Sequence, residues 1–277
     1  MAVMEATQLA YREIKPLIGA EVLAGRDALL GGEHAADLGE LLERRGVLVF
    51  PKIGLGDEEQ IAFTKTLGEY APDLADGGVT PISIDPRVSA SADFTRTSFF
   101  WHFDGYMNDV PIRASIMSAR VLSPTGGKTE FCNTYAAYEE LPEERKRQIE
   151  GLSAVHAHAG AHLSLEPEPS YERFSQWLTI PCNTLPLVWT HRSGRKSLVI
   201  GNTAVNVVGM DPLEGLDLLV WLRDWATQDR FTYSHDWTIG DTVMWDNTGT
   251  LHRVTPYPAD SGRLMHRTKL AGEEPFA

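Results

Sequence analysis

Apolar residues recur along the chain with two different periods, and these periods predict helices and strands in separate places. Residues 36–46 carry three leucines at helical spacing, and Gly46 follows them as a helix stop. The next four residues, 47–50, form a short apolar run that is typical of a buried strand, and Pro51 ends it. The N-terminal part of the chain therefore begins with a helix that leads into a strand.

Two further helices have starting signals. Asp57 and Gln60 stand at the spacing of a capping box and predict a helix that runs toward Leu67. The segment 211–214 combines an aspartate cap, a proline at the first helical position and an acid at the third. Apolar residues continue from there at helical spacing as far as Trp225, so a longer helix is expected in this part of the chain.

Most of the remaining pattern indicates β-structure. Short apolar runs are bounded by Gly, Pro, Asp or Asn, and they fall at residues 112–121, 196–200, 242–245 and 264–270. N-terminal helices followed by many short strands predict a β-sandwich or jelly roll. Residues 1–277 contain no internal repeat or linker, so we expect one domain. Within it, residues 72–98 and 160–184 have the composition of lid-like loops.

Composition narrows the range of partners. The net charge of −13 repels a polyphosphate, so nucleic acid is not an expected partner. Apolar runs are too short for a membrane span of about 18 residues, and the first residues lack the features of a signal peptide. Cys132 and Cys182 form no CxxC pattern, which favours a reducing cytoplasm. A small anionic substrate remains compatible with this charge, because one buried arginine can dominate a pocket.

Three residues have the donor types of a metal site. His102 and Asp104 are two positions apart, so on a strand both side chains would point to one face. His252 follows a predicted strand far downstream. Two histidines and one carboxylate form the facial triad of non-haem Fe(II) oxygenases, which leaves coordination positions open. An HxD pair alone is a weak signal, and a loop histidine is the alternative for His252.

Other polar clusters are given structural interpretations. His156, His158 and His162 are expected to be core or loop histidines, because no acid or cysteine stands near them. Trp101 and Trp245 are expected to pack at the mouth of the barrel. The pairs Arg44-Arg45 and Lys146-Arg147 are interpreted as solvated helix faces.

The ordered motifs of nearly the whole chain resemble the TauD/TfdA family of Fe(II)- and 2-oxoglutarate-dependent dioxygenases. The resemblance rests on GVLVFPKIGLGDEEQIAFTKTLGEY near the N-terminus, WHFDGY at the HxD pair, GGKTEF at 126–131, HRSGRKSLVIG at 191–201 and GDTVMWDNTGTLHRVTPY…GRLMHR near the C-terminus. It implies a mainly β fold with flanking helices, namely a double-stranded β-helix (jelly roll, cupin-like).

The resemblance also implies roles for individual residues. His102, Asp104 and His252 would bind Fe(II), and Thr129 and Arg263 would bind 2-oxoglutarate. A guanidinium suits the distal carboxylate of this co-substrate, and a hydroxyl can add a further hydrogen bond. Arg267 occupies the position that contacts the substrate anion in relatives acting on sulfonates or aryloxy acids. Its alternative role is to serve the co-substrate.

The substrate is expected to be a small apolar or aromatic carboxylic acid. Ser98 and Phe100 come just before the HxD pair and would line the substrate side of the cavity. Ser98 stands where taurine-specific relatives carry asparagine, which argues against taurine. The segment GRKSLVIG resembles the relatives that cleave aryloxyalkanoates.

The implied reaction consumes O2 and 2-oxoglutarate, hydroxylates an unactivated C–H bond and releases succinate and CO2. Hydroxylation beside an ether oxygen would also cleave the ether. The alternatives are the same chemistry on a sulfonate, a sulfate ester or a neutral natural product. A non-redox metal hydrolase or isomerase and a catalytically silent binding protein are rivals of other classes. The first has no need of Thr129 and Arg263 as a 2-oxoglutarate anchor, and the second need not keep all three metal ligands. A homo-oligomer is compatible with the resemblance.

Overall fold

A computed structural model describes residues 9–277. Four sheets occur in this part of the chain, and their order explains the architecture. The largest has seven strands in the order β1-β2-β3-β13-β5-β15-β4, and a three-stranded sheet has the order β12-β6-β14. Two smaller sheets have the orders β11-β7-β8 and β10-β9.

The strands are short, as the apolar pattern indicates. Their bounds are β1 Tyr11–Glu13, β2 Ala20–Val22, β3 Val47–Phe50, β4 Thr80–Ile82, β5 Ala114–Val121, β6 Thr129–Asn133, β7 Ser153–His156, β8 Asn183–Pro186, β9 Val188–Thr190, β10 Lys196–Leu198, β11 Ala204–Val207, β12 Thr232–His235, β13 Thr242–Asp246, β14 Thr250–Val254 and β15 Leu264–Leu270. The helices are α1 Arg26–Gly31, α2 Ala35–Arg45, α3 Asp57–Leu67, α4 Ala92–Thr95, α5 Thr134–Glu139, α6 Glu143–Ile149, α7 His158–Leu163, α8 Tyr171–Trp177 and α9 Pro212–Ala226, with short 3-10 turns at Arg96–Phe99, Asp229–Phe231 and Ala259–Ser261.

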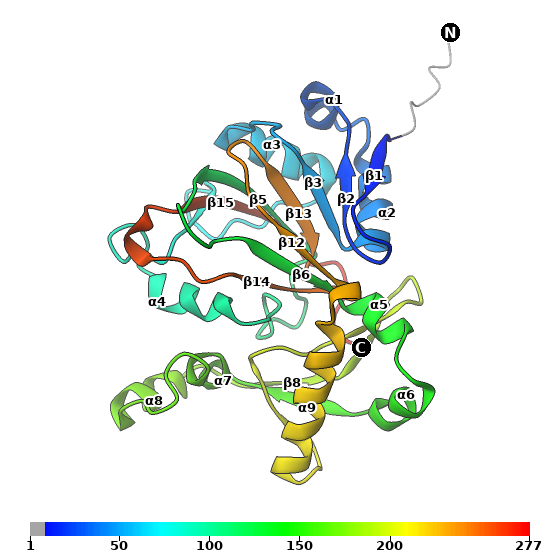
Figure 1. Ribbon diagram of the computed structural model, residues 1–277, viewed down its shortest axis with the longest axis vertical. Coiled ribbons are helices and arrows are strands. Elements are labelled where there is room, and N and C mark those ends of the chain that lie inside the picture. The colour runs from blue at the N-terminus through cyan, green and yellow to red at the C-terminus, as the bar shows by residue number, and fades with distance from the viewer. Residues whose placement is uncertain (1–8) are drawn as a thin grey trace.

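Two sheets face one another across a buried layer. Side chains from the seven-stranded sheet, among them Val243 and Met265, pack with Phe131 of β6 and Trp237. The opposite face of the large sheet packs on α2 and α3, through residues such as Leu41 and Phe63. Figure 1 shows α1, α2 and α3 on this outer side. The result is a jelly roll with helices outside it, which confirms the expected fold class.

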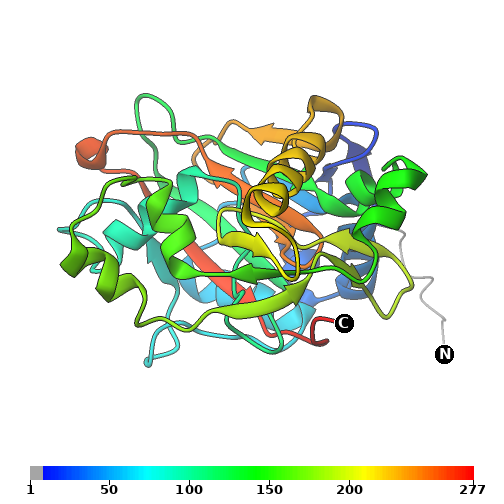
Figure 2. The ribbon, with the colours of Figure 1, turned by 90° about the horizontal axis from the view of Figure 1, so that it is seen from below.

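A second layer lies beyond the three-stranded sheet β12-β6-β14. Cys132 of β6 and Leu251 of β14 point away from the jelly-roll interior and pack with Leu218 and Leu222 of α9. Helix α9, gold in Figure 2, crosses this side of the molecule. The Asp211 carboxylate caps the helix by accepting hydrogen bonds from the backbone of Leu213 and Glu214, as its sequence signal predicts.

One helix start differs from its prediction by a residue. The N-cap of α3 is Gly56, and the Glu59 carboxylate accepts a hydrogen bond from its backbone N–H at 2.8 Å. The predicted pair, Asp57 and Gln60, does not form a capping box. Gln60 is instead fully buried, and its amide donates to the carbonyls of Ile116 and His266. A buried amide between two strands finds stronger partners there than at the helix end.

Two further expectations need correction. The segments 72–98 and 160–184 are not loops throughout, because they contain β4, α4, α8 and most of α7. These elements are too short to leave a periodic signal. Arg45 is not solvated: it is 8% exposed and donates to the carbonyls of Pro16 and Gly19, so it ties α2 to the chain before β2. Its neighbour Arg44 is exposed, as expected.

Cys132 is buried and Cys182 is exposed, and both are free thiols. No helix among the described residues is both long and apolar enough to cross a membrane.

Candidate active site

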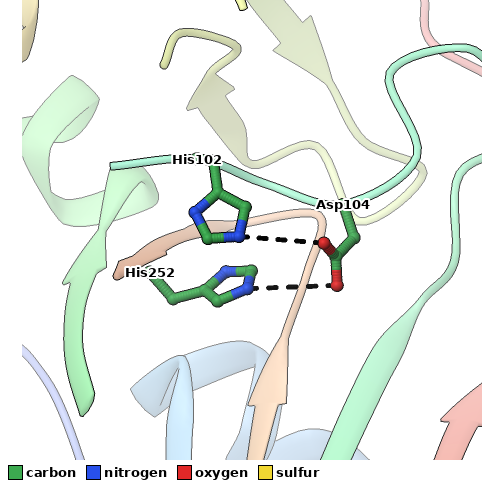
Figure 3. A group of neighbouring side chains, drawn as sticks. All are labelled: His102, Asp104 and His252. Atoms are coloured by element: carbon green, nitrogen blue, oxygen red, sulfur yellow. Dashed lines mark ion pairs between the residues drawn. The ribbon is translucent and has the colours of Figure 1, made fainter. Parts of the chain in front are cut away.

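The HxD segment and β14 are held together by a single β-bridge. His102 N donates to His252 O at 3.0 Å, and His252 N donates to His102 O at 2.8 Å. The prediction that His102 and Asp104 share the face of a regular strand is wrong, because the chain around Asp104 is irregular. The bridge still brings all three side chains to one point, which Figure 3 shows.

The three candidate ligands converge closely. The Nε2 atoms of His102 and His252 each lie 3.9 Å from a different oxygen of Asp104. One donor atom from each residue lies within 4.8 Å of the others, and residues 9–277 contain no second such cluster. His156 and His158 belong to different elements, β7 and α7. The His156 ring bonds to the hydroxyl of Thr203 at 2.8 Å, which accords with a core histidine.

Hydrogen bonds orient two of the three ligands. His102 Nδ1 donates to the carbonyl of Phe100 at 2.9 Å, which leaves Nε2 free to bind a metal. The backbone of Asp104 is held by Asn247, whose side chain accepts from Asp104 N at 2.8 Å and donates to Asp104 O at 2.9 Å. His252 packs against Trp245, with ring centroids 4.9 Å apart.

The surroundings favour the protonation states that a metal requires. Burial lowers the pKa of both His102 and His252, so their rings are neutral. Burial alone would raise the pKa of Asp104, but the charge of Arg267, with smaller contributions from the neighbouring histidines and Lys269, outweighs it and lowers the value to about 2. A carboxylate and two neutral imidazoles are the donor set of a non-haem iron site, so the residues fit this metal.

Arg263 is a buried cation close to the β12-β6-β14 sheet, which carries His252. It is 3% exposed, and its Nη2 donates to the carbonyl of Gly127 at 3.1 Å. Its guanidinium lies over the ring of Tyr257, 4.8 Å from the centroid, and within residues 9–277 its Nε has no hydrogen-bond partner and no carboxylate pairs with it. Burial lowers the pKa of Arg263, which nevertheless stays charged near neutral pH. A buried cation without an anion is costly, and an anionic ligand would remove that cost.

Thr129 lies on β6, where its register partner in β14 is Val254. The indole N–H of Trp237 donates to its hydroxyl oxygen at 2.9 Å. Because this oxygen already accepts a hydrogen bond, its own hydrogen is available to an anion. Thr129 and His252 share the inward face of their sheet, since side chains alternate along each strand.

Arg267 contacts the metal triad directly. Its Nη1 donates to Asp104 Oδ2 at 2.9 Å, and its Nη2 donates to Asp73 Oδ2 at 3.3 Å. It lies on β15 between β4 and β5, two positions from Lys269. The structure therefore places Arg267 beside the triad, with one further carboxylate on its other side.

The remaining candidates are Ser98 and Phe100, whose side chains are predicted to line the substrate side of the cavity. The hydroxyl of Ser98 donates to the carbonyl of Thr95 at 2.6 Å, within its own short helical turn. The side chain of Phe100 lines a cavity of about 440 Å³ together with Glu130 and Arg253. Those two residues point outward from their strands, opposite to His252. The role of Ser98 and Phe100 as substrate contacts stays a prediction.

Sequence patterns missed two residues of the site. Asn247 is two positions after Trp245, and only its position beyond the end of β13 places it against Asp104. Asp73 lies in a segment with a loop-like composition, and its contacts with β15 span nearly 200 residues of sequence. Neither residue has a local signal, because both contacts depend on how distant strands pair.

Comparison with known proteins agrees with this geometry. Residues 10–269 match the family described as "Taurine catabolism dioxygenase TauD, TfdA family". The chain belongs to the TauD/TfdA family. It is a 2-oxoglutarate-dependent dioxygenase, as its relatives' names also indicate.

Several TauD/TfdA relatives align over most of their length. An alpha-ketoglutarate-dependent 2,4-dichlorophenoxyacetate dioxygenase of Burkholderia sp. (strain RASC) is 36% identical, and the alignment covers 94% of this chain and 93% of that one. An alkylsulfatase of Acinetobacter baylyi is 30% identical over 96% of this chain and 86% of the relative. Among solved structures, "Crystal structure of AAD-2 in complex with Mn(II) and N-oxalylglycine" gives a TM-score of 0.83 at 31% identity, covering 98% of this chain and 100% of that one.

Proposed function

We propose that this dioxygenase is iron-dependent and acts on a small aryloxyalkanoic acid or a similar apolar carboxylic acid. The residue assignment rests on two observations: three metal donors converge without protons, and the buried Arg263 lacks an anion. The relatives support the substrate class, because two 2,4-dichlorophenoxyacetate dioxygenases align at 36% and 35% identity.

In this proposal His102, Asp104 and His252 hold the iron. When bound, iron and 2-oxoglutarate supply the oxidation of an unactivated C–H bond by O2, coupled to release of succinate and CO2. Arg263 binds the distal carboxylate of 2-oxoglutarate, and the Thr129 hydroxyl adds a hydrogen bond. Trp237 fixes the orientation of that hydroxyl, and Asn247 fixes the chain at Asp104.

No side chain is needed as a general base. The chain's own contribution is to orient both substrates and to exclude water from the reacting carbon. Hydroxylation of the carbon beside an ether oxygen gives a hemiacetal, which separates into an alcohol or phenol and a carbonyl compound. Hydroxylation and ether cleavage are therefore one reaction on different substrates.

A sulfate monoester is the second candidate substrate. The alkylsulfatase and an alpha-ketoglutarate-dependent sulfate ester dioxygenase of Pseudomonas putida, 28% identical, favour it. An aryloxyalkanoate and a sulfate monoester each carry one negative charge close to a carbon atom that is bonded to oxygen. A natural product is a weaker alternative, because the pentalenolactone F synthase of Streptomyces avermitilis aligns with only 63% of this chain.

Substrate-triggered succinate release tests the proposal. The panel contains 2,4-dichlorophenoxyacetate, (S)-2-phenoxypropionate, hexyl sulfate and the uncharged amide of each acid. We expect the two carboxylic acids to raise succinate release well above the rate without substrate. Their uncharged amides should leave that rate unchanged. Turnover by the amides alone would show that the substrate is not recognised as an anion.

A spectroscopic experiment tests the metal assignment separately. Anaerobic addition of Fe(II) and 2-oxoglutarate should produce a weak visible charge-transfer band in the wild type and none in His252→Ala. His156→Ala is the matched control, because it removes a buried histidine outside the triad. Absence of the band in the wild type would overturn the iron assignment. The cytoplasmic location and a homo-oligomeric state stay predictions.

A further inference from the structure

A short segment before β4 is fastened beside the triad. Ala71 N donates to the carbonyl of Lys269 at 2.9 Å, and the hydroxyl of Tyr70 donates to the carbonyl of Gly78 at 2.8 Å. The hydroxyl of Thr80 donates to Asp73 Oδ2 at 2.8 Å. These bonds hold the segment at both ends, so Asp73 has a defined position.

Asp73 faces two cations of one strand. Arg267 and Lys269 are two positions apart on β15, so both side chains point to the same face. Arg267 donates to Asp73 Oδ2 at 3.3 Å, and Lys269 donates to Asp73 Oδ1. The three side chains are 30%, 19% and 16% exposed for Asp73, Arg267 and Lys269, so water screens their charges only in part.

Asp73 is ionised in this setting. Partial burial would raise its pKa, but the hydrogen bond from Lys269, the charge of Arg267 and the bond from Thr80 hold the value below its ordinary range. It therefore carries a full negative charge near neutral pH.

The charges around the triad do not balance. Arg263, Arg267 and Lys269 contribute three positive charges, and Asp73 and Asp104 contribute two negative ones. An iron(II) ion and a 2-oxoglutarate dianion cancel one another when both bind. One positive charge is then left in the loaded site, and this excess is the same whether Arg267 contacts the substrate or the co-substrate.

We propose that Asp73 is a specificity-determining residue that sets this excess at one positive charge and so matches the site to a substrate with one negative charge. The inference rests on the proposed function, since it assumes an anionic substrate. Removal of the Asp73 charge would leave two positive charges and favour ligands of higher negative charge. A unit charge at about 5 Å in a partly buried site alters such affinities by tenfold or more.

Charge-altering variants test the idea without turnover. Asp73→Asn keeps the size and an acceptor for Thr80, and Lys269→Gln removes one positive charge. Calorimetric titration of 2-oxoglutarate into the Mn(II)-loaded protein should show tighter binding in Asp73→Asn and weaker binding in Lys269→Gln, each by about tenfold or more. The double variant should return to the wild-type affinity, which a loss of local structure would not produce.

Asp76→Asn is the matched control. Asp76 lies on the same segment, where its carboxylate accepts only a local bond from Gly78 N at 2.9 Å. It should leave 2-oxoglutarate affinity unchanged. Equal or weaker binding in Asp73→Asn, or no recovery in the double variant, would overturn the charge-setting role.

A pair of substrates tests selectivity. Phenoxyacetate and phenoxymethylphosphonate share the aryl ether but carry one and two negative charges at slightly alkaline pH. The ratio of kcat/KM for the carboxylate to that for the phosphonate should fall at least about tenfold in Asp73→Asn. An unchanged ratio would refute the selectivity role.

The two experiments separate the possible failures. If neither acid triggers succinate release in the wild type, the proposed substrate class is wrong, while the titrations still decide the role of Asp73. If the wild type turns over phenoxyacetate and the variants change neither affinity nor ratio, the substrate class stands and the role of Asp73 is overturned.

Discussion

Asn247 holds Asp104 by both polar groups of its backbone: its Oδ1 accepts from Asp104 N at 2.8 Å, and its Nδ2 donates to Asp104 O at 2.9 Å. The same amide nitrogen donates to Ile112 O at 3.1 Å. Asn247 is 2% exposed, so water cannot replace these bonds. The position of a proposed iron ligand in an irregular segment therefore depends on one buried amide.

Replacement of this amide should weaken metal binding. Asn247→Ala removes the side-chain partner of three backbone groups, one buried and two part-buried. A buried group left unsatisfied costs about 1–3 kcal/mol of stability, and a part-buried one costs less. We expect a lower Tm and metal affinity reduced by about tenfold or more, because loss of such supporting contacts has this effect in metal sites. Mn(II) titration and thermal unfolding measure both quantities.

The control for this variant is Asn183→Ala. Asn183 in β8 also donates to a backbone carbonyl of this segment, that of Tyr106 at 2.9 Å, but it makes no hydrogen bond to Asp104 itself. It should lower Tm without a change in metal affinity. Equal loss of affinity in both variants would show that the Asn247 effect is general destabilisation.

Arg263→Lys tests the anchor for 2-oxoglutarate. Lysine keeps the charge but loses the planar fork that pairs with a carboxylate and the stacking on Tyr257. A hydrogen bond to a charged group is worth about 1.5–3 kcal/mol, so KM for 2-oxoglutarate should rise roughly tenfold or more. Arg253→Lys, on the outer face of β14, should leave this KM unchanged, and a similar rise there would count against the assignment.

Gly127→Ala should displace the same anchor, Arg263, by a steric clash. Gly127 has φ of +76°, and an added Cβ would lie 2.9 Å from Arg263 Nε. Alanine there adds backbone strain of about 1 kcal/mol and pushes Arg263 from its position. We expect a raised KM for 2-oxoglutarate together with a lower Tm.

Gly151→Ala separates the two effects of that substitution. Gly151 has φ of +73°, and nothing lies within 4 Å of an added Cβ, so its replacement introduces backbone strain alone. Its Tm should fall while KM for 2-oxoglutarate stays at the wild-type value. If Gly127→Ala behaves in the same way, Gly127 has no part in placing Arg263.

Asp241 should give the fold a pH dependence. Burial would raise its pKa, but the contact with His235 and hydrogen bonds from the backbone of Lys52 and Thr238 hold the value below its ordinary range. A depressed carboxylate pKa stabilises the fold fully above the unfolded pKa of about 3.9. The contribution is lost as pH falls through the lower, folded-state pKa.

Thermal unfolding across pH measures this contribution. The Tm difference between wild type and Asp241→Asn should be largest at neutral pH and shrink below about pH 4. Asp236→Asn is the control, since that carboxylate is 75% exposed in its pair with Lys128. A difference that stays constant down to pH 2 would mean that Asp241 acts through shape and not through charge.

Local patterns predicted the elements that have a strong local cause. β15 spans the predicted residues 264–270, and α9 begins at its aspartate cap, because strand alternation and capping each depend on neighbours within a few positions. The short elements within 72–98 and 160–184 have no such cause, and their stability comes from packing. The same holds for Arg45, whose charge indicated solvent while its partners were carbonyls of a distant turn.

The order of residues along the chain was enough to name the chemical groups that this protein has for its reaction. The ordered motifs were sufficient to identify the family and to nominate His102, Asp104, His252, Thr129, Arg263 and Arg267. Tertiary structure alone decided how these groups are arranged: a single β-bridge aligns the histidines, Asn247 holds Asp104, and Asp73 reaches Arg267. The physical reason is that hydrogen bonds and charge contacts act over a few ångströms, whereas these partners are separated by more than 140 residues of chain.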